Sequence, residues 1–261
     1  MKNAMRRALL ATTATMAIVG ANGTAHADQA LTLTPDKGIN VVGDSTTSAP
    51  GFSSGSWQAA GNGTKSEFYI NMASLFGPTE NNVTIGDIKS ISYWTNKAGD
   101  GGAPDWTLDI YTNKTGTGDT GSFYHTRLNA EPYFTQTTVA SNTWHQWSTD
   151  GPNALTFYDQ PRDGNYGTYN DPTLAGIQAS SRNYSAETIK YLSLQTGSNI
   201  ANSFVGLVDG LTVTLNDNAV ATINFEAAVA TPEPSTIALA CTALPVGLIL
   251  AWRRRKAKLA A

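Results

Sequence analysis

Short segments in which apolar and polar residues alternate recur between residues 66 and 225. Around Leu108, for example, Trp106, Leu108 and Ile110 fall on one side of an extended chain, and Asp109 and Tyr111 fall on the other. Such alternation is typical of β-strands with one buried and one solvated face. It predicts that Trp106 lies in the core and that Tyr111 is exposed beside Asp109. The predicted strands are residues 66–72, 87–95, 106–112, 122–128, 133–138, 143–148, 155–158, 189–195, 204–208, 211–215 and 220–225.

Helical periodicity is weak along the same stretch. One short helix is predicted at residues 171–181, with Asp171 as the N-cap and Pro172 as the first helical residue. A turn is predicted at residues 71–76. Because helices do not separate the strands, a parallel sheet is disfavoured. The pattern predicts an all-β fold, a two-sheet antiparallel sandwich of the jelly-roll or concanavalin-like kind.

Charge is distributed unevenly along the chain. Only 14% of the 261 residues are charged, and the formal net charge is −3. Eight of the 17 basic residues lie at the two ends, whereas residues 28–230 hold nine basic and 19 acidic residues, a net charge of −10. An acidic body of this kind disfavours nucleic acid as a partner.

The first 27 residues have the organisation of a secretory signal peptide. A segment with three Lys or Arg residues precedes an apolar run at residues 8–21, and Ala25-His26-Ala27 has the small-x-small pattern of a cleavage site. We therefore expect an exported protein whose body begins at Asp28. A permanent N-terminal anchor is the alternative.

The C-terminal end has three parts in a fixed order. Pro232-Glu233-Pro234 comes first, an apolar and uncharged run ending at Trp252 follows, and Arg253-Arg254-Arg255-Lys256 comes last. Residues 235–252 are predicted to form one transmembrane helix, because about 1.5 Å per residue brings them close to a hydrocarbon core of ~30 Å. Basic clusters stay on the cytoplasmic side, which places the body across the inner membrane. An ordinary tail anchor is the simpler interpretation.

This three-part end, residues 231–258, resembles the PEP-CTERM sorting signal of bacteria with an outer membrane. The resemblance implies recognition by an exosortase in the inner membrane, which would cut near the Pro-Glu-Pro motif. The mature form would then lie at the cell surface or outside the cell. Association with extracellular polysaccharide and biofilm matrix is also implied. The resemblance concerns the destination of the protein and not the activity of its body.

Several kinds of chemistry are disfavoured for the body. The only cysteine, Cys241, lies in the predicted transmembrane helix, which excludes a thiol nucleophile and a disulfide framework from residues 28–230. The G-x-S-x-G match at residues 51–55 is not followed by a predicted helix, and the G-x-G-x-x-G match at residues 116–121 leads into a predicted strand. The sequence predicts that the body is not an enzyme.

Two short segments of the body resemble laminin-G and concanavalin-like sandwiches. Thr143-Trp144-His145 is similar to a Trp-His strand start in those domains, and residues 204–210 are similar to their closing strand, in which an Asp precedes the last apolar segment. The resemblance is confined to these two short segments and supports the sandwich.

Acidic loops provide candidate ligands for calcium. Asp159, Asp163 and Asp171 lie in a segment rich in Asn, Gly and Pro. Calcium takes six to eight oxygen ligands, which two such loops together can supply. EF-hand spacing is missing, and solvated turns are the alternative interpretation, because Asp, Asn and Gly are common in turns.

Aromatic residues provide candidate contacts for a sugar. Sugars stack on exposed aromatic rings and hydrogen-bond to amides and carboxylates. Trp94, and Tyr111 beside Asp109, are the candidates on these grounds. Burial in the core is the alternative for each ring.

Two functional hypotheses follow, and a third is weaker. The first is a non-catalytic surface or matrix protein, sorted by an exosortase, with an adhesive or structural sandwich. The second is a carbohydrate-binding module for exopolysaccharide, with calcium as a possible aid. The third is a glycan hydrolase or lyase, which requires two carboxylates in one groove.

Overall fold

The structure is a computed structural model of the 261-residue chain. It describes residues 29–32, 38–44, 46–52, 55–98, 105–113, 127–135, 137–160, 170–180, 183–197 and 204–227. The predicted signal peptide and the predicted sorting segment, with its transmembrane helix, lie outside these residues. Among the residues described, no helix is long and apolar enough to cross a membrane.

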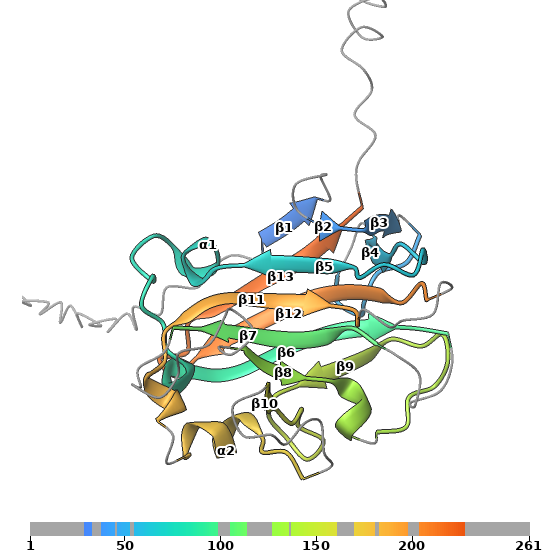
Figure 1. Ribbon diagram of the computed structural model, residues 1–261. Helices are drawn as coiled ribbons and strands as arrows, with labels where there is room; N and C mark the ends of the chain where they lie inside the picture. The colour runs from blue at the N-terminus through green and yellow to red at the C-terminus, as the bar shows by residue number, and fades with distance from the viewer. Residues whose placement is uncertain are drawn as a thin grey trace, which may run out of the picture.

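Two β-sheets form a sandwich, which confirms the predicted fold class. Figure 1 shows the long strands of both sheets running along a common direction, as in aligned sheet packing. The seven-stranded sheet contains β1 (Gln29–Thr32), β13 (Val220–Glu226), β12 (Leu207–Leu215), β4 (Ser56–Ala59) and β3 (Val41–Asp44) in this order, and β6 (Ile88–Asn96) joins β12 to β9 (His145–Ser148). The six-stranded sheet has the order β10 (Tyr158–Gln160), β8 (Arg127–Ala130), β7 (Thr107–Thr112), β11 (Ile189–Gln195), β5 (Glu67–Ile70) and β2 (Gly38–Ile39).

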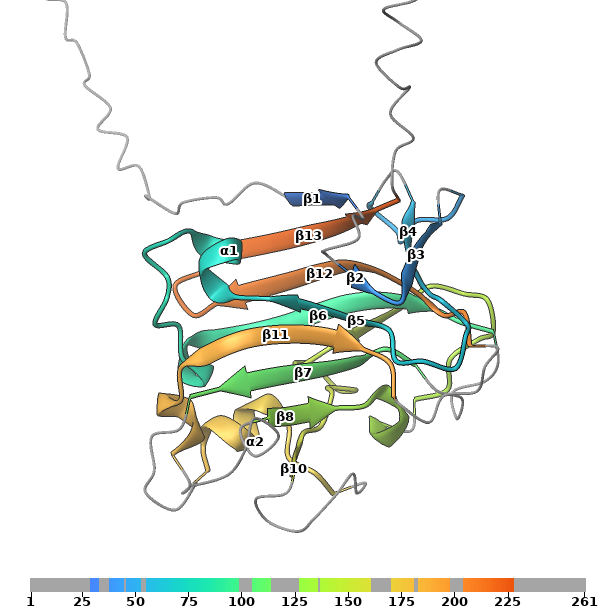
Figure 2. The same cartoon turned by 45° about the horizontal axis from the view of Figure 1, so that its top comes forward.

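Strand pairing is antiparallel except at one edge. There β1 pairs in parallel with β13, so the first and last described strands lie side by side (Figure 2). The longest ladders join β12 to β6 and β11 to β7, and they bring together segments distant in the sequence. The centre of each sheet is therefore fixed by long-range pairing.

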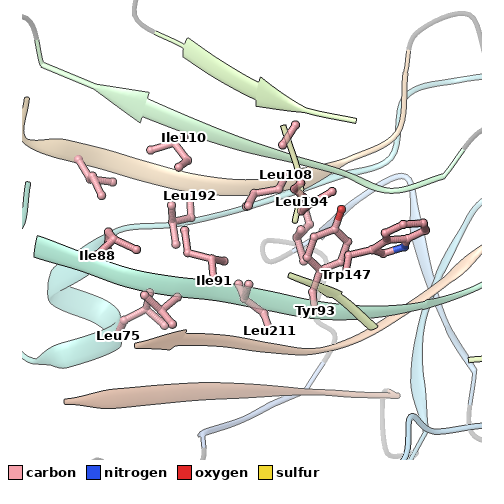
Figure 3. Close-up of a cluster of buried hydrophobic side chains, with 14 of the residues drawn as sticks. Leu75, Ile88, Ile91, Tyr93, Leu108, Ile110, Trp147, Leu192, Leu194 and Leu211 are labelled. Carbon is pink, nitrogen blue, oxygen red and sulfur yellow. The ribbon is translucent and has the colours of Figure 1, made fainter. Parts of the chain in front are cut away.

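The core fills the space between the sheets. Apolar side chains from β7 and β11 face those from β6 and β12 (Figure 3). Trp106 is completely buried, as its place in the alternating pattern predicts. At one end of the core the rings of Trp57, Phe68 and Phe225 pack with centroid separations of 4.8 to 5.5 Å. The inward positions of the strands thus carry the packing.

The two α-helices in the described part of the chain each begin at a side-chain cap. Asn71 caps α1 (Met72–Phe76), and its Oδ1 accepts a hydrogen bond from the backbone N–H of Ser74 at 2.7 Å. For α2 (Leu174–Gln178) the cap is Thr173, so the predicted cap at Asp171 is wrong. The Pro172 carbonyl accepts a hydrogen bond from the backbone N–H of Phe157, which directly precedes β10. This bond holds the backbone around Pro172 extended, so the helix begins only after Thr173.

One predicted strand, at residues 133–138, is also wrong. Residues Pro132–Thr135 form a 3₁₀ helix instead. The Phe134 N–H donates to the Glu131 carbonyl, and the Thr135 hydroxyl donates back to the Pro132 carbonyl. These local hydrogen bonds, which Thr side chains form readily, compete with an extended conformation.

Candidate functional site

The outer face of the six-stranded sheet carries a row of polar side chains. In β7 the side chains of Leu108 and Ile110 point into the core, so Asp109 points outward. Strand register places Asp109 directly between Asn129 of β8 and Ser193 of β11. Gln195, two residues after Ser193 on β11, continues the same face.

These four side chains are buried although they face away from the core. Asp109 is 0% exposed, Asn129 2%, Ser193 1% and Gln195 4%. Within the described part of the chain, both Asp109 carboxylate oxygens, Asn129 Nδ2, Ser193 Oγ and Gln195 Oε1 have no hydrogen-bond partner. Buried polar atoms are nearly always paired in proteins, so such a concentration calls for a functional explanation. We call these four residues the buried polar layer.

A pocket of about 250 Å³ lies against the buried polar layer. Its lining residues are almost all of polar type and come from β7, β8, β10, β11 and the segment before β5. The lining side chains include Lys65, Asp109, Arg127, Asn129, Glu131, Tyr158 and Gln195. The pocket therefore sits where unpartnered polar atoms are most concentrated.

Charged groups around the pocket act on Asp109. Burial raises the pKa of Asp109 to about 7, against the opposing effect of Arg127 and Lys65. The carboxylates of Glu131 and Glu67 raise the pKa further. Asp109 therefore changes its charge near neutral pH, which is unusual for an aspartate.

The residues around Asp109 hold one another in place. Lys65 Nζ lies 2.6 Å from Glu67 Oε2, and the Tyr69 hydroxyl donates to the same oxygen at 2.9 Å. The Tyr158 hydroxyl donates to Glu131. Burial and Glu131 raise the pKa of Tyr158, so its hydroxyl remains a donor at ordinary pH.

Tyr111 shares the outer face with Asp109, but it is not exposed as predicted. Its side chain is 1% exposed, because the Arg127 guanidinium lies 5.9 Å from the ring centroid and Tyr69 packs at 5.8 Å. The exposed ring on this face is Tyr191, at 41%. Tyr191 lies opposite Tyr111 in the strand register and packs edge-on against Tyr69.

A second group of rings adjoins the pocket. Phe134 packs edge-on between Tyr158 and Tyr133, with centroid separations of 6.0 and 5.2 Å. Tyr133 is 44% exposed. Aromatic surface is thus available beside the polar pocket.

Trp94 does not belong to this site. It lies on β6 in the other sheet, opposite Gln146 of β9 and Asp209 of β12. Its side chain is half-buried. The structure therefore separates Trp94 from Asp109 and Tyr111, which the sequence grouped as candidate sugar contacts.

The candidate calcium ligands are placed only in part. Asp159 pairs with Leu128 as a residue of β10, Asp163 lies outside the described residues, and Asp171 is half-buried before α2. Among the described side chains, no group of three or more His, Cys, Asp or Glu is arranged to hold a metal ion. Calcium binding stays a prediction.

Sequence reasoning missed most of the pocket. Arg127 and Asn129 on β8, and Ser193 and Gln195 on β11, alternate with buried apolar residues, and this alternation is a signal for one outward face. Alternation within one strand does not reveal how that strand pairs with its neighbours, so it could not show that Asn129 and Ser193 lie beside Asp109.

Comparisons with known proteins add little to this geometry. No protein-family model and no curated protein matches the chain. Among solved structures, the chain is similar to SGBP-B from a complex xyloglucan utilization locus in Bacteroides uniformis, with 15% identity and a TM-score of 0.28. The match covers 72% of this chain and 46% of that protein, so the chain spans less than half of its length.

Proposed function

We propose that the body of this protein is a non-catalytic β-sandwich that binds carbohydrate through the pocket beside Asp109. One observation carries the proposal: a pocket on the sheet face is lined by Asp109, Asn129 and Gln195, whose buried hydrogen-bonding atoms include several without a partner among the described residues. Leaving a buried polar atom unpaired costs about 1–3 kcal/mol. A ligand rich in hydroxyl groups offsets this cost, directly or through ordered water.

The surroundings of the pocket also suit a sugar. Small-molecule sites combine a few convergent polar groups with aromatic surface. Here the polar groups include Asp109, Asn129 and Gln195 of the buried polar layer, and Tyr133 and Tyr191 are exposed rings on the same sheet face or beside it. Such rings pack against the apolar faces of sugar rings, while amides and carboxylates bind the hydroxyls.

The size of the pocket indicates how much of a polysaccharide it holds. Its volume of about 250 Å³ is below the usual ~300–1,000 Å³ of ligand pockets. It therefore suits one sugar ring rather than a run of several. A chain end or a side branch is the expected target.

The sorting proposal rests on the sequence alone. We propose that the protein is exported, held in the inner membrane by residues 235–252, and released to the cell surface by an exosortase that recognises Pro232-Glu233-Pro234 and the Arg253 to Arg255 cluster. A polysaccharide-binding body would act at that location, on the matrix outside the cell.

A glycan array with the full-length protein in detergent tests the binding proposal. We expect binding that falls at least tenfold in Asn129→Ala, because Asn129 lines the pocket. Gln146→Ala is the matched control, since Gln146 is an exposed amide on the other sheet. Absence of binding to every glycan, or equal binding by Asn129→Ala and the parent protein, would refute the proposal.

Glycan cleavage is the second candidate for the same pocket. Asp109 and Glu131 both line it, and two carboxylates in one groove are what a glycosidase requires. The pKa of about 7 that burial gives Asp109 also suits a general acid. Release of reducing ends, or of unsaturated products, from an array ligand would establish cleavage and replace the non-catalytic proposal.

The sorting proposal has a separate test. We expect that deleting residues 237–258 leaves the protein outside the membrane fraction and uncut near Pro234. Cell fractionation with mass determination of the processed form measures both. Unchanged membrane retention and processing in the deletion variant would show that these residues are not a sorting signal.

A further inference from the structure

We propose that the pocket takes a neutral sugar ring and rejects sugars that carry a carboxylate. This inference rests on the proposed carbohydrate binding and specifies the class of sugar. It follows from two features of the pocket: the kind of hydrogen-bonding atom that lacks a partner, and the charges that surround those atoms.

The unpartnered atoms of the buried polar layer are mainly acceptors. Asp109 offers two carboxylate oxygens and Gln195 offers Oε1, and none of the three has a partner among the described residues. Asn129 Nδ2 is the one unpartnered atom of this layer that can only donate, and the Ser193 hydroxyl, which lies behind the lining residues, can do either. A ligand that satisfies this set must bring donors.

Hydroxyl groups bring donors, and a carboxylate does not. An ionised carboxylate is an acceptor only, so a uronic acid would set its oxygens against those of Asp109 and Gln195. The sugar hydroxymethyl group at the same ring position both donates and accepts. The pocket therefore discriminates between the two groups through hydrogen-bond pairing.

The charges around the pocket reinforce this preference. Lys65 and Arg127 are its cationic lining residues, and Asp109 and Glu131 are its anionic ones. Lys65 is also engaged by Glu67, whose Oε2 lies 2.6 Å from Nζ. No surplus positive charge is therefore left among the described lining residues to compensate a ligand carboxylate.

Matched sugar pairs test the proposal. Methyl glucoside and methyl glucuronide, and the corresponding galacto and manno pairs, are titrated into the full-length protein and followed by NMR. The two sugars of each pair differ only in that one carries a hydroxymethyl group where the other carries a carboxylate. A pH of 8.5 is used, because it exceeds the pKa of about 7 of Asp109 and keeps that carboxylate ionised.

We expect the neutral member of the binding pair to bind at least tenfold more tightly than the acid. In Asp109→Asn, which replaces one acceptor by a donor and removes a negative charge, this ratio should fall at least threefold. Glu80→Gln removes a charge from a half-buried residue after α1 and should leave the ratio unchanged.

The net charge of the body, −10 by sequence, also disfavours anions and must be separated from the pocket. Raising NaCl from 0.15 M to 0.5 M screens distant charges. If the preference for neutral sugars disappears at 0.5 M NaCl, it arises from the net charge of the whole body and not from the pocket, and this proposal is overturned. Equal or tighter binding of the acids would overturn it while leaving carbohydrate binding intact. Failure of all six sugars and of every array glycan would overturn both.

Discussion

Lys97 and Asp105 form an ion pair inside the sandwich, with Lys97 Nζ 3.7 Å from Asp105 Oδ2 and side chains only 2% and 1% exposed. The same carboxylate oxygen accepts a hydrogen bond from Thr95 Oγ1 at 2.9 Å, and Thr95 accepts one from Trp147 Nε1 at 2.8 Å. Burial nevertheless raises the pKa of Asp105 to about 6. The pair thus connects the end of β6 with the start of β7 at an electrostatic cost.

Removing one partner of this ion pair should destabilise the fold more than removing both. We expect Lys97→Met to lower the free energy of unfolding by about 3–5 kcal/mol, because it leaves the Asp105 charge buried and uncompensated. The double variant Lys97→Met/Asp105→Asn should recover most of this loss. Urea denaturation of the two single variants and the double variant measures the coupling. Additive effects in this cycle would contradict an interaction between the two side chains.

The Asp109 carboxyl should make stability depend on pH. Its pKa is about 7 in the folded protein against an ordinary 3.8, so the unfolded chain loses this proton first and the folded state is weakened as pH rises through that window. Asp109→Asn should therefore be more stable than the parent protein at pH 8, by a few kcal/mol at about 1.4 kcal/mol per pKa unit. At pH 4 the difference should nearly vanish. Thermal unfolding at both pH values measures it, and a gain that does not vary with pH would contradict the pKa.

The alternating pattern was sufficient to predict most of the long strands and the fold class. It failed for short strands such as β4, in which three of four residues are buried, so no alternation is visible. It also divided β12 into two strands at Asp209 and Gly210, where the structure continues the strand but shifts its register against β6 between Asp209 and Thr212. Strands of this kind are defined by their neighbours in the sheet and not by their own sequence.

The candidate site was predictable only on a single strand. Alternation places Asp109 and Tyr111 on one outer face, and the structure agrees. It could not show that Arg127 and Tyr69 cover Tyr111, nor that Asn129 lies beside Asp109, because register arises from long-range pairing. Alternation shows that a residue points outward, but it does not show whether water or another side chain covers that residue.

Asp209 should be essential for stability because it ties three segments together. One carboxylate oxygen accepts backbone N–H bonds from Gly210 and Phe225, and the other accepts one from Ala49. Asp209→Ala would leave these donors buried and unpaired, so we expect a loss of about 3 kcal/mol or more in unfolding free energy.

A matched control for this prediction is Asp217→Ala. Asp217 is an exposed aspartate that accepts a single backbone N–H, from Ala219 at 2.9 Å. The Asp217→Ala change should lower the free energy of unfolding by no more than about 1 kcal/mol, since water can replace the lost acceptor. Chemical denaturation of both variants gives the comparison, and similar losses would show that the three bonds to Asp209 contribute little.

Gly210 should be unusually sensitive to substitution, because two constraints act on it at once. Its φ is +61°, and a Cβ atom there would lie 2.5 Å from Phe52 Cε2 and 3.0 Å from Trp94 Cδ1. Gly151 has φ +87° but nothing within 4 Å of an added Cβ, so Gly151→Ala isolates the backbone strain, about 1–2 kcal/mol.

We expect Gly210→Ala to lower the free energy of unfolding by about 1–3 kcal/mol more than Gly151→Ala does, since the rings of Phe52 and Trp94 must move. The additional Phe52→Ala change should reduce this excess if the ring contact causes it. Thermal and urea unfolding of the single and double variants measure the difference, and equal losses at the two glycines would show that the rings give way freely.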